Sequence, residues 1–97
     1  MNYDTFIKST TLAHPSNDLS NIQLALWYIV NNNWDKAHNI IQGINTDVAA
    51  WIHAYLHRLE GDIGNAKYWY NRANKPCSKL SLKLELEHII KTILNDN

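Results

Sequence analysis

Two histidines and a glutamate recur at helical spacing in the stretch "WIHAYLHRLEGD". His53, His57 and Glu60 are separated by four and then three residues, so on a helix their side chains fall within about 60° of one another at 100° per residue. Two imidazoles and a carboxylate that converge in this way are acceptable ligands for a divalent ion such as zinc, nickel or copper. The same groups could serve acid–base chemistry, because imidazole titrates near neutrality and a carboxylate beside it can orient the ring. The spacing therefore indicates a candidate metal or catalytic site.

A simpler interpretation of these three residues stays open. Their stripe lies away from the apolar face of the helix, so the histidines could hydrogen-bond to neighbouring helices or to Asp62, or face water. His38 and Asp62 are candidate further ligands if the turns bring them near. The sequence alone does not decide between a ligand site and structural histidines.

A second candidate surface lies in the aromatic run "YWY". Tyr68 shares a side of its helix with Arg72, whereas the two rings that follow Tyr68 flank an alanine and are expected in the core. Tyrosine and arginine are enriched at the energetic centres of interfaces. Tyr68 and Arg72 are therefore candidate partner-binding or ligand-binding residues. The alternative is that this side packs under the C-terminal helix, with Arg72 paired to Glu85 or Glu87.

Apolar residues recur at intervals of three and four along most of the chain, which predicts an all-α fold. We expect about five helices, arranged as two antiparallel helix-turn-helix pairs and a C-terminal capping helix. Their predicted first residues follow the capping side chains Asp18, Asn33, Thr46 or Asp47, Asp62 and Ser78, and Gly61 and Pro76 are predicted to end the third and fourth helices.

The expected domain organisation is simple. Residues 1–17 show no sustained period and are predicted to form a loosely packed N-terminal arm with at most one short turn around residues 4–8. Residues 18–94 form a single helical-repeat domain, and residues 95–97 form a frayed tail.

The helix pairs resemble the tetratricopeptide class of repeats. The matching positions are a small residue in the first helix, a Gly-Asp turn, an alanine, an aromatic residue four later, a second alanine and a proline: Ala54, Gly61-Asp62, Ala66, Tyr70, Ala73 and Pro76. The resemblance covers residues 18–76. It implies stacked helix pairs with a concave face that binds peptides. The corresponding alanines Ala37 and Ala66 are 29 residues apart, whereas these repeats have a period of about 34.

A narrower resemblance concerns three segments together. "WDKAH", "AAWIHAYLHRLEGD" and "NAKYWYNRA" are similar to a group of small uncharacterised bacterial and fungal proteins. This resemblance implies that the three segments belong to one structure, and it implies no activity.

Composition excludes several classes of function. The chain has 97 residues with nine basic and nine acidic side chains, so it lacks the positive charge that drives nucleic-acid binding. A single cysteine, Cys77, excludes an internal disulfide and multi-cysteine zinc sites, and no motif assigns a base to its thiol, so an inert thiol is expected. The longest apolar run is far shorter than a membrane span. A cytoplasmic location is predicted, without membrane or nucleic-acid partners.

We therefore expect a small protein–protein interaction module without a cofactor, binding a protein or peptide, with a homodimer as an open alternative. The rival hypothesis is a protein that binds a divalent metal such as zinc, or a small ligand, through His53, His57 and Glu60, with or without hydrolytic activity. An enzyme is the less favoured interpretation, because no nucleophile is placed by any pattern.

Overall fold

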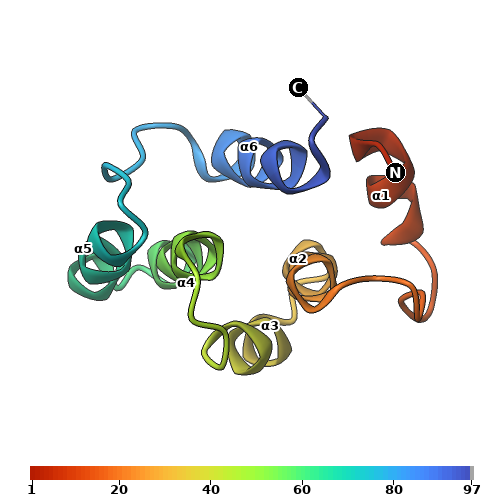
Figure 1. Cartoon of the computed structure of the whole chain (residues 1–97), viewed down its shortest axis with the longest axis horizontal. Coiled ribbons are helices and arrows are strands. Elements are labelled where there is room, and N and C mark those ends of the chain that lie inside the picture. The colour runs from red at the N-terminus through yellow and green to blue at the C-terminus, as the bar shows by residue number, and fades with distance from the viewer. Residues whose placement is uncertain (97) are drawn as a thin grey trace.

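The computed structural model describes residues 1–96, and within that range every regular element is an α-helix (Figure 1). The predicted all-α class is confirmed, with six helices in place of the expected five. The residue at the end of the predicted frayed tail, Asn97, lies outside the described residues. The helices are α1 (Tyr3–Ser9), α2 (Asn21–Val30), α3 (Trp34–Ile41), α4 (Asp47–Leu59), α5 (Ile63–Arg72) and α6 (Leu82–Leu94).

Each helix begins after a polar side chain that accepts a hydrogen bond from the backbone N–H three residues on. Asn33, Thr46 and Asp62 cap α3, α4 and α5 as their positions in the sequence predict. Side-chain caps of this kind are local, so they can be recognised without knowledge of the tertiary fold.

Two of the predicted caps are wrong. Ser20, not Asp18, caps α2, because Gln23 bonds back to the Ser20 backbone N–H and completes a capping box. Ser81, not Ser78, caps α6, and Ser78 instead accepts a hydrogen bond from the backbone N–H two residues on. Both helices therefore start two or three residues later than expected.

Glycine and asparagine, not proline, end the central helices. Gly61 follows α4 with φ of 85°, a left-handed conformation that favours glycine, as predicted. Helix α5 ends at Arg72, and Asn74 has φ of 58°. The chain has thus left the helix before it reaches Pro76, so the prediction that Pro76 closes α5 is wrong.

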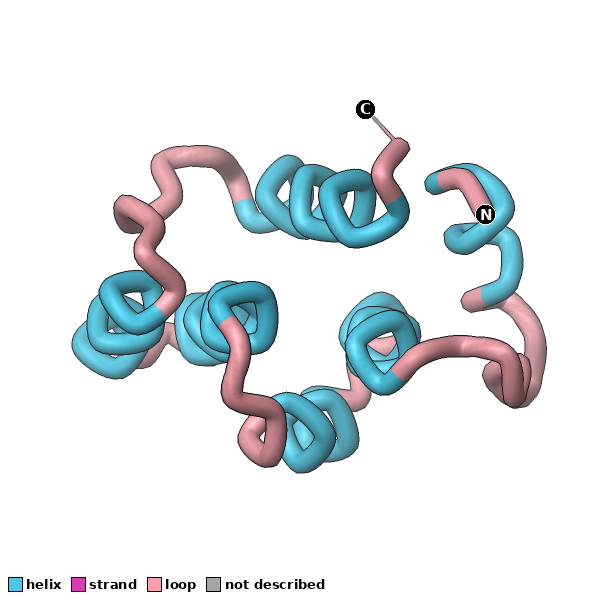
Figure 2. The backbone as a smooth tube through the Cα atoms, in the orientation of Figure 1, coloured by secondary structure: helices cyan, strands magenta, loops and turns pink. Residues whose placement is uncertain are grey.

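The helices pack as two neighbouring pairs, α2 with α3 and α4 with α5, and α6 lies across α2 and α4 (Figure 1). Short turns join the helices within and between the pairs, whereas longer loops precede α2 and follow α5 (Figure 2). The longest helices, α4 and α6, have 13 residues each. A bilayer requires about 20 apolar residues, and no helix among residues 1–96 meets that requirement.

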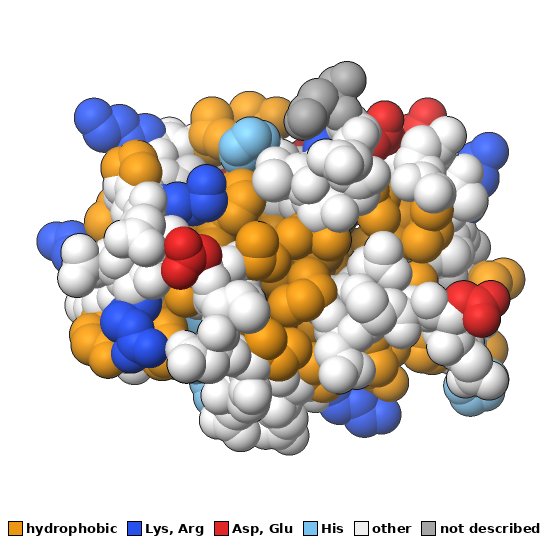
Figure 3. All heavy atoms as spheres, in the orientation of Figure 1, with side chains coloured by type: hydrophobic (Ala, Val, Ile, Leu, Met, Phe, Trp, Pro, Cys, Tyr) orange, Lys and Arg blue, Asp and Glu red, His pale blue; other side chains and the backbone are white. Residues whose placement is uncertain are grey.

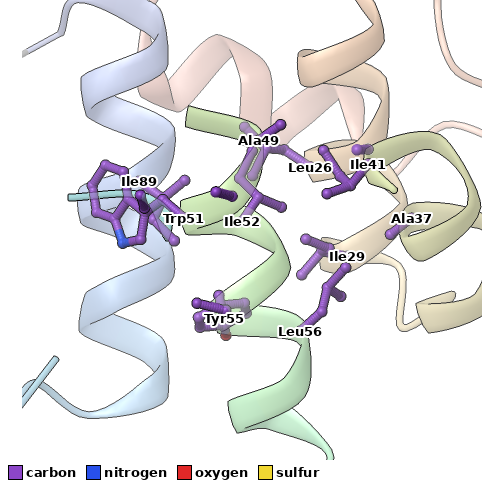
Figure 4. Packing of buried hydrophobic residues seen from close by; sticks show 14 of the residues in the cluster. Leu26, Ile29, Ala37, Ile41, Ala49, Trp51, Ile52, Tyr55, Leu56 and Ile89 are labelled. Carbon is purple, nitrogen blue, oxygen red and sulfur yellow. The ribbon is translucent and has the colours of Figure 1, made fainter. Parts of the chain in front are cut away.

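Helix α4 lies at the centre of the molecule. Residues 49–57 are buried without interruption, so every face of this stretch is covered by other elements. Apolar side chains of α2, α3 and α6 converge on it, including Leu26, Ile41 and Ile89 (Figure 4). On the face shown in Figure 3, hydrophobic side chains gather in the middle and charged side chains lie toward the periphery. A helix covered on all sides must find partners inside the protein for each of its polar side chains.

A buried carboxylate fastens α6 to the α4–α5 pair. Glu85 is 1% exposed, and its oxygens accept hydrogen bonds from the Tyr70 hydroxyl at 2.6 and 2.8 Å and from Trp51 Nε1 at 3.3 Å. Arg58 Nη1 lies 2.7 Å from Glu85 Oε1 and balances its charge. The Arg58 guanidinium also donates to the Leu80 carbonyl in the loop before α6. The network satisfies the charge on Glu85 and fixes the position of α6.

The predicted loose arm instead contains helix α1. Phe6 is fully buried, and Trp27 Nε1 donates to the Ser9 carbonyl at 3.1 Å. The Tyr3 backbone N–H donates to Asp96 Oδ2 at 2.6 Å, so residues near the two ends of the described chain are joined. The short helix is stabilised by these contacts with α2 and with the end of α6, which the local sequence pattern does not reveal.

Removal of the buried carboxylate tests the role of this network. We expect Glu85→Ala to lower the free energy of unfolding by about 3–5 kcal/mol, because Arg58 is left without its counter-charge and Tyr70 without an acceptor. Glu87→Ala is the matched control on the same helix, since Glu87 forms only a half-exposed pair with Lys91 and should change the value by less than about 0.5 kcal/mol. Denaturant titration measures both variants, and equal small effects would contradict this account.

Candidate metal centre

Three histidine rings gather where α3, α4 and α5 meet. His53 and His57 lie one turn apart on α4, and His38 approaches them from α3. One ring nitrogen of each histidine lies within 4.8 Å of those of the other two. His38 Nε2 and His53 Nε2 lie 3.1 Å apart, a distance at which one ring donates an N–H to the lone pair of the other. The fold thus places the His38 imidazole beside His53 and His57, which the sequence spacing alone brings together.

Two tryptophans enclose the three rings. The Trp34 indole stacks on His38 with ring centroids 4.6 Å apart, and the Trp69 indole stacks on His53 at 3.8 Å, each within 10° of parallel. Trp34 is held in place by its Nε1, which donates to the Leu56 carbonyl at 2.8 Å. The indoles restrict the rotation of both imidazoles and keep them close to the same point.

The cluster continues toward the surface through His57. His57 Nδ1 lies 2.7 Å from Glu60 Oε1, and the Glu60 side chain is 40% exposed. His57, Glu60 and Asp62 form a second group whose potential ligand atoms lie within 4.8 Å of one another. His57 therefore belongs to two groups, an inner one with two imidazoles and an outer one with two carboxylates.

Burial keeps the inner histidines neutral. Loss of hydration lowers the pKa of His53 to about 4, and the nearby His38 and His57 rings add to the effect. Burial and the neighbouring His57 also lower the pKa of His38 from its ordinary value. Because a metal ion binds the lone pair of a neutral imidazole, these two rings are in the protonation state that coordination requires at neutral pH.

Of the environments considered for the histidines, the structure shows hydrogen bonding to a neighbouring helix, since His53 bonds to His38 of α3. His53 and His57 are only 5% and 7% exposed, so their stripe does not face water. The reason is that α3 and α5 cover this side of α4, whereas α6 packs on another side of it. Of the two further ligands considered, His38 joins the inner group and Asp62 joins the outer group. Glu60 belongs with Asp62 to the outer group.

The predicted binding residues on α5 lie apart from the three rings. Tyr68 is 52% exposed, and Arg72 Nη1 donates to the Tyr68 hydroxyl at 3.0 Å. The alternative pairing of Arg72 with Glu85 or Glu87 is wrong, because Arg58 pairs with Glu85 and Lys91 pairs with Glu87. Trp69, expected in the core, is half-buried and separates the Tyr68 and Arg72 pair from His53.

Sequence reasoning missed the two indoles. Trp34 and His38 are four residues apart in "WDKAH", a spacing that places them together on one helix face. That signal was available in the sequence, whereas the stacking of Trp69 on His53 depends on how α5 packs against α4.

Comparison of the chain with protein-family models, with curated proteins and with solved structures finds no match in any of the three. The chain is a small all-helical protein with packed helix pairs.

The lowered pKa of His53 predicts a pH-dependent stability of the metal-free protein. The unfolded state takes up a proton on His53 near its ordinary pKa of about 6.5, whereas the folded state does so at about 4. The free energy of unfolding should therefore rise with pH between these two values and level off above them. Denaturant midpoints measured with a chelator present test this expectation. The slope should shrink in His53→Gln and persist in His14→Gln, whose ring is exposed in a loop; a flat profile would contradict it.

Proposed function

We propose that this protein binds a divalent transition-metal ion through His38, His53 and His57. The observation that carries the proposal is the convergence of three imidazole nitrogens from two packed helices within 4.8 Å of one another. In a tetrahedral zinc site, nitrogens about 2.05 Å from the ion lie roughly 3.3 Å apart. The 3.1 Å between His38 Nε2 and His53 Nε2 is close to that spacing, and coordination through both nitrogens requires the proton shared between them to move to Nδ1 of its ring.

The ligand set favours a particular class of metal. Three neutral imidazoles suit zinc, copper and nickel, whereas calcium and magnesium prefer oxygen ligands. The stacked indoles of Trp34 and Trp69 keep the rings in position before an ion arrives, which lowers the entropic cost of binding.

Calorimetric titration of the chelator-stripped protein with zinc and nickel tests the proposal. We expect one ion per chain at a dissociation constant on the order of micromolar or tighter, and quenching of Trp34 and Trp69 fluorescence by nickel or copper. His38→Gln should weaken binding by at least about 100-fold, the upper end of what loss of a ligand-orienting partner costs. His38 is the least buried of the three rings, so this variant is the least disruptive.

Two exposed histidines outside the cluster supply the matched controls. His14→Gln and His88→Gln should leave the affinity unchanged. Circular dichroism of each variant checks that its helices are kept. Absence of binding by the native protein, or equal losses in the control variants, would contradict the metal site.

A second proposed function is a protein-interaction module that follows a tetratricopeptide-like arrangement of the helix pairs. The observation that favours it is the exposed Tyr68 ring with Arg72 hydrogen-bonded to its hydroxyl on the outer side of α5. Aromatic and arginine side chains in this combination are frequent at interfaces. A homodimer through α5 is the simplest form of this function.

Sedimentation equilibrium tests the homodimer. If α5 forms the contact, the native chain associates and the double variant Tyr68→Ser with Arg72→Ala raises the dissociation constant at least about 10-fold, as loss of an interface anchor does. Lys67→Ala is the control, since it removes an exposed charge from the same helix. A native chain that remains monomeric at all concentrations would exclude the homodimer.

A further inference from the structure

In the hydrogen bond between His57 and Glu60, the donor and the acceptor can be assigned. Glu60 Oε1 lies 2.7 Å from His57 Nδ1, and an ionised carboxylate can only accept a hydrogen bond. The proton therefore resides on Nδ1. In a neutral imidazole the other nitrogen, Nε2, then carries the lone pair.

We infer that Glu60 is a positioning residue, whose carboxylate holds the His57 ring in the tautomer and orientation that a metal ion at His38, His53 and His57 requires. This inference rests on the proposed metal site. At this site Glu60 orients His57 and does not bind the ion, although its spacing from His53 and His57 in the sequence suggests a ligand.

The backbone fixes Glu60 at the place from which it reaches the ring. Glu60 is the last residue before the left-handed Gly61, and its own N–H still bonds to the Leu56 carbonyl at 3.2 Å. Its side chain therefore projects from an ordered helix end, three residues beyond His57. An orienting group must itself be held in place, and the end of α4 meets that requirement.

The two groups that share His57 cannot use it at the same time. Nδ1 is the His57 nitrogen that faces Glu60. Binding an ion with Glu60 and Asp62 through Nδ1 would require the lone pair on Nδ1 and place the proton on Nε2, which then could not bind an ion shared with His38 and His53. The position of the His57 ring proton, on Nδ1 or on Nε2, thus decides whether the ring can bind an ion in the inner group or in the outer group. The inner one is favoured because two further imidazoles lie there, His53 buried and His38 half-buried, whereas Glu60 and Asp62 are exposed to water.

Three variants separate the two roles of Glu60. Glu60→Ala removes the acceptor and should weaken zinc binding by about 10–100-fold, the usual cost of losing a partner that orients a histidine ligand. Glu60→Gln retains an amide oxygen that accepts from Nδ1–H, so it should restore the affinity to within about 3-fold of the native value. Asp62→Asn keeps the cap of α5 and should leave the affinity unchanged.

The outcomes distinguish this inference from the proposed function. Equal losses in Glu60→Gln and Glu60→Ala, together with a loss in Asp62→Asn, would show that the carboxylates bind the ion directly. Native affinity in Glu60→Ala would overturn the positioning role while leaving the three-histidine site intact. Failure of the native protein to bind zinc would refute the proposed function itself.

A measurement without metal provides an independent readout. Nitrogen-15 NMR of the histidine rings should show His57 protonated at Nδ1 in the native protein and in Glu60→Gln, and a mixture of tautomers in Glu60→Ala. Protonation at Nε2 in the native protein would overturn the inference, whatever the affinities.

Discussion

Burial of α4 on every side is the constraint on which the rest of the structure depends. No face of residues 49–57 is available to water, so each polar side chain on this helix has to be satisfied by the helices around it. On one side Trp51 donates to the buried carboxylate of α6, and Arg58, at the end of the helix, balances its charge. On the other, His53 and His57 meet His38 and two indoles. Both polar clusters follow from the central position of one helix.

The sequence predicts the fold where the signal is local. Caps such as Asn33 and Asp62, and the left-handed turn at Gly61, need only neighbouring residues, so their positions are recovered. Helix α1 was expected only as one short turn around residues 4–8, because its stability comes from burial of Phe6 and from a hydrogen bond between Tyr3 and Asp96, which are far apart in the chain. Long-range contacts of this kind leave no periodic pattern in a short segment.

The candidate site likewise combines features that local spacing predicts with features that depend on tertiary packing. Helical spacing pairs His53 with His57 and also places Glu60 nearby, but spacing cannot tell a ligand from a group that orients one. His38 could be named as a further ligand without any means of placing it. The side of α4 that carries these histidines has few aliphatic residues, so it resembles a solvent-facing stripe. Its burial results from aromatic rings on α3 and α5, whose stacking on imidazole is a property of the packed pairs.

The position of α6 changes what the two helix pairs can offer to another molecule. Helix α6 lies across the first helix of each pair, α2 and α4, and residues 73–81 tether it there (Figure 1). It is in effect an intramolecular ligand for the surface that these two helices share. A tethered segment competes at an effective concentration on the order of millimolar. A helix or peptide from another protein would bind this surface only by displacing α6 and breaking the hydrogen bonds of Glu85, so its apparent affinity there would be reduced accordingly.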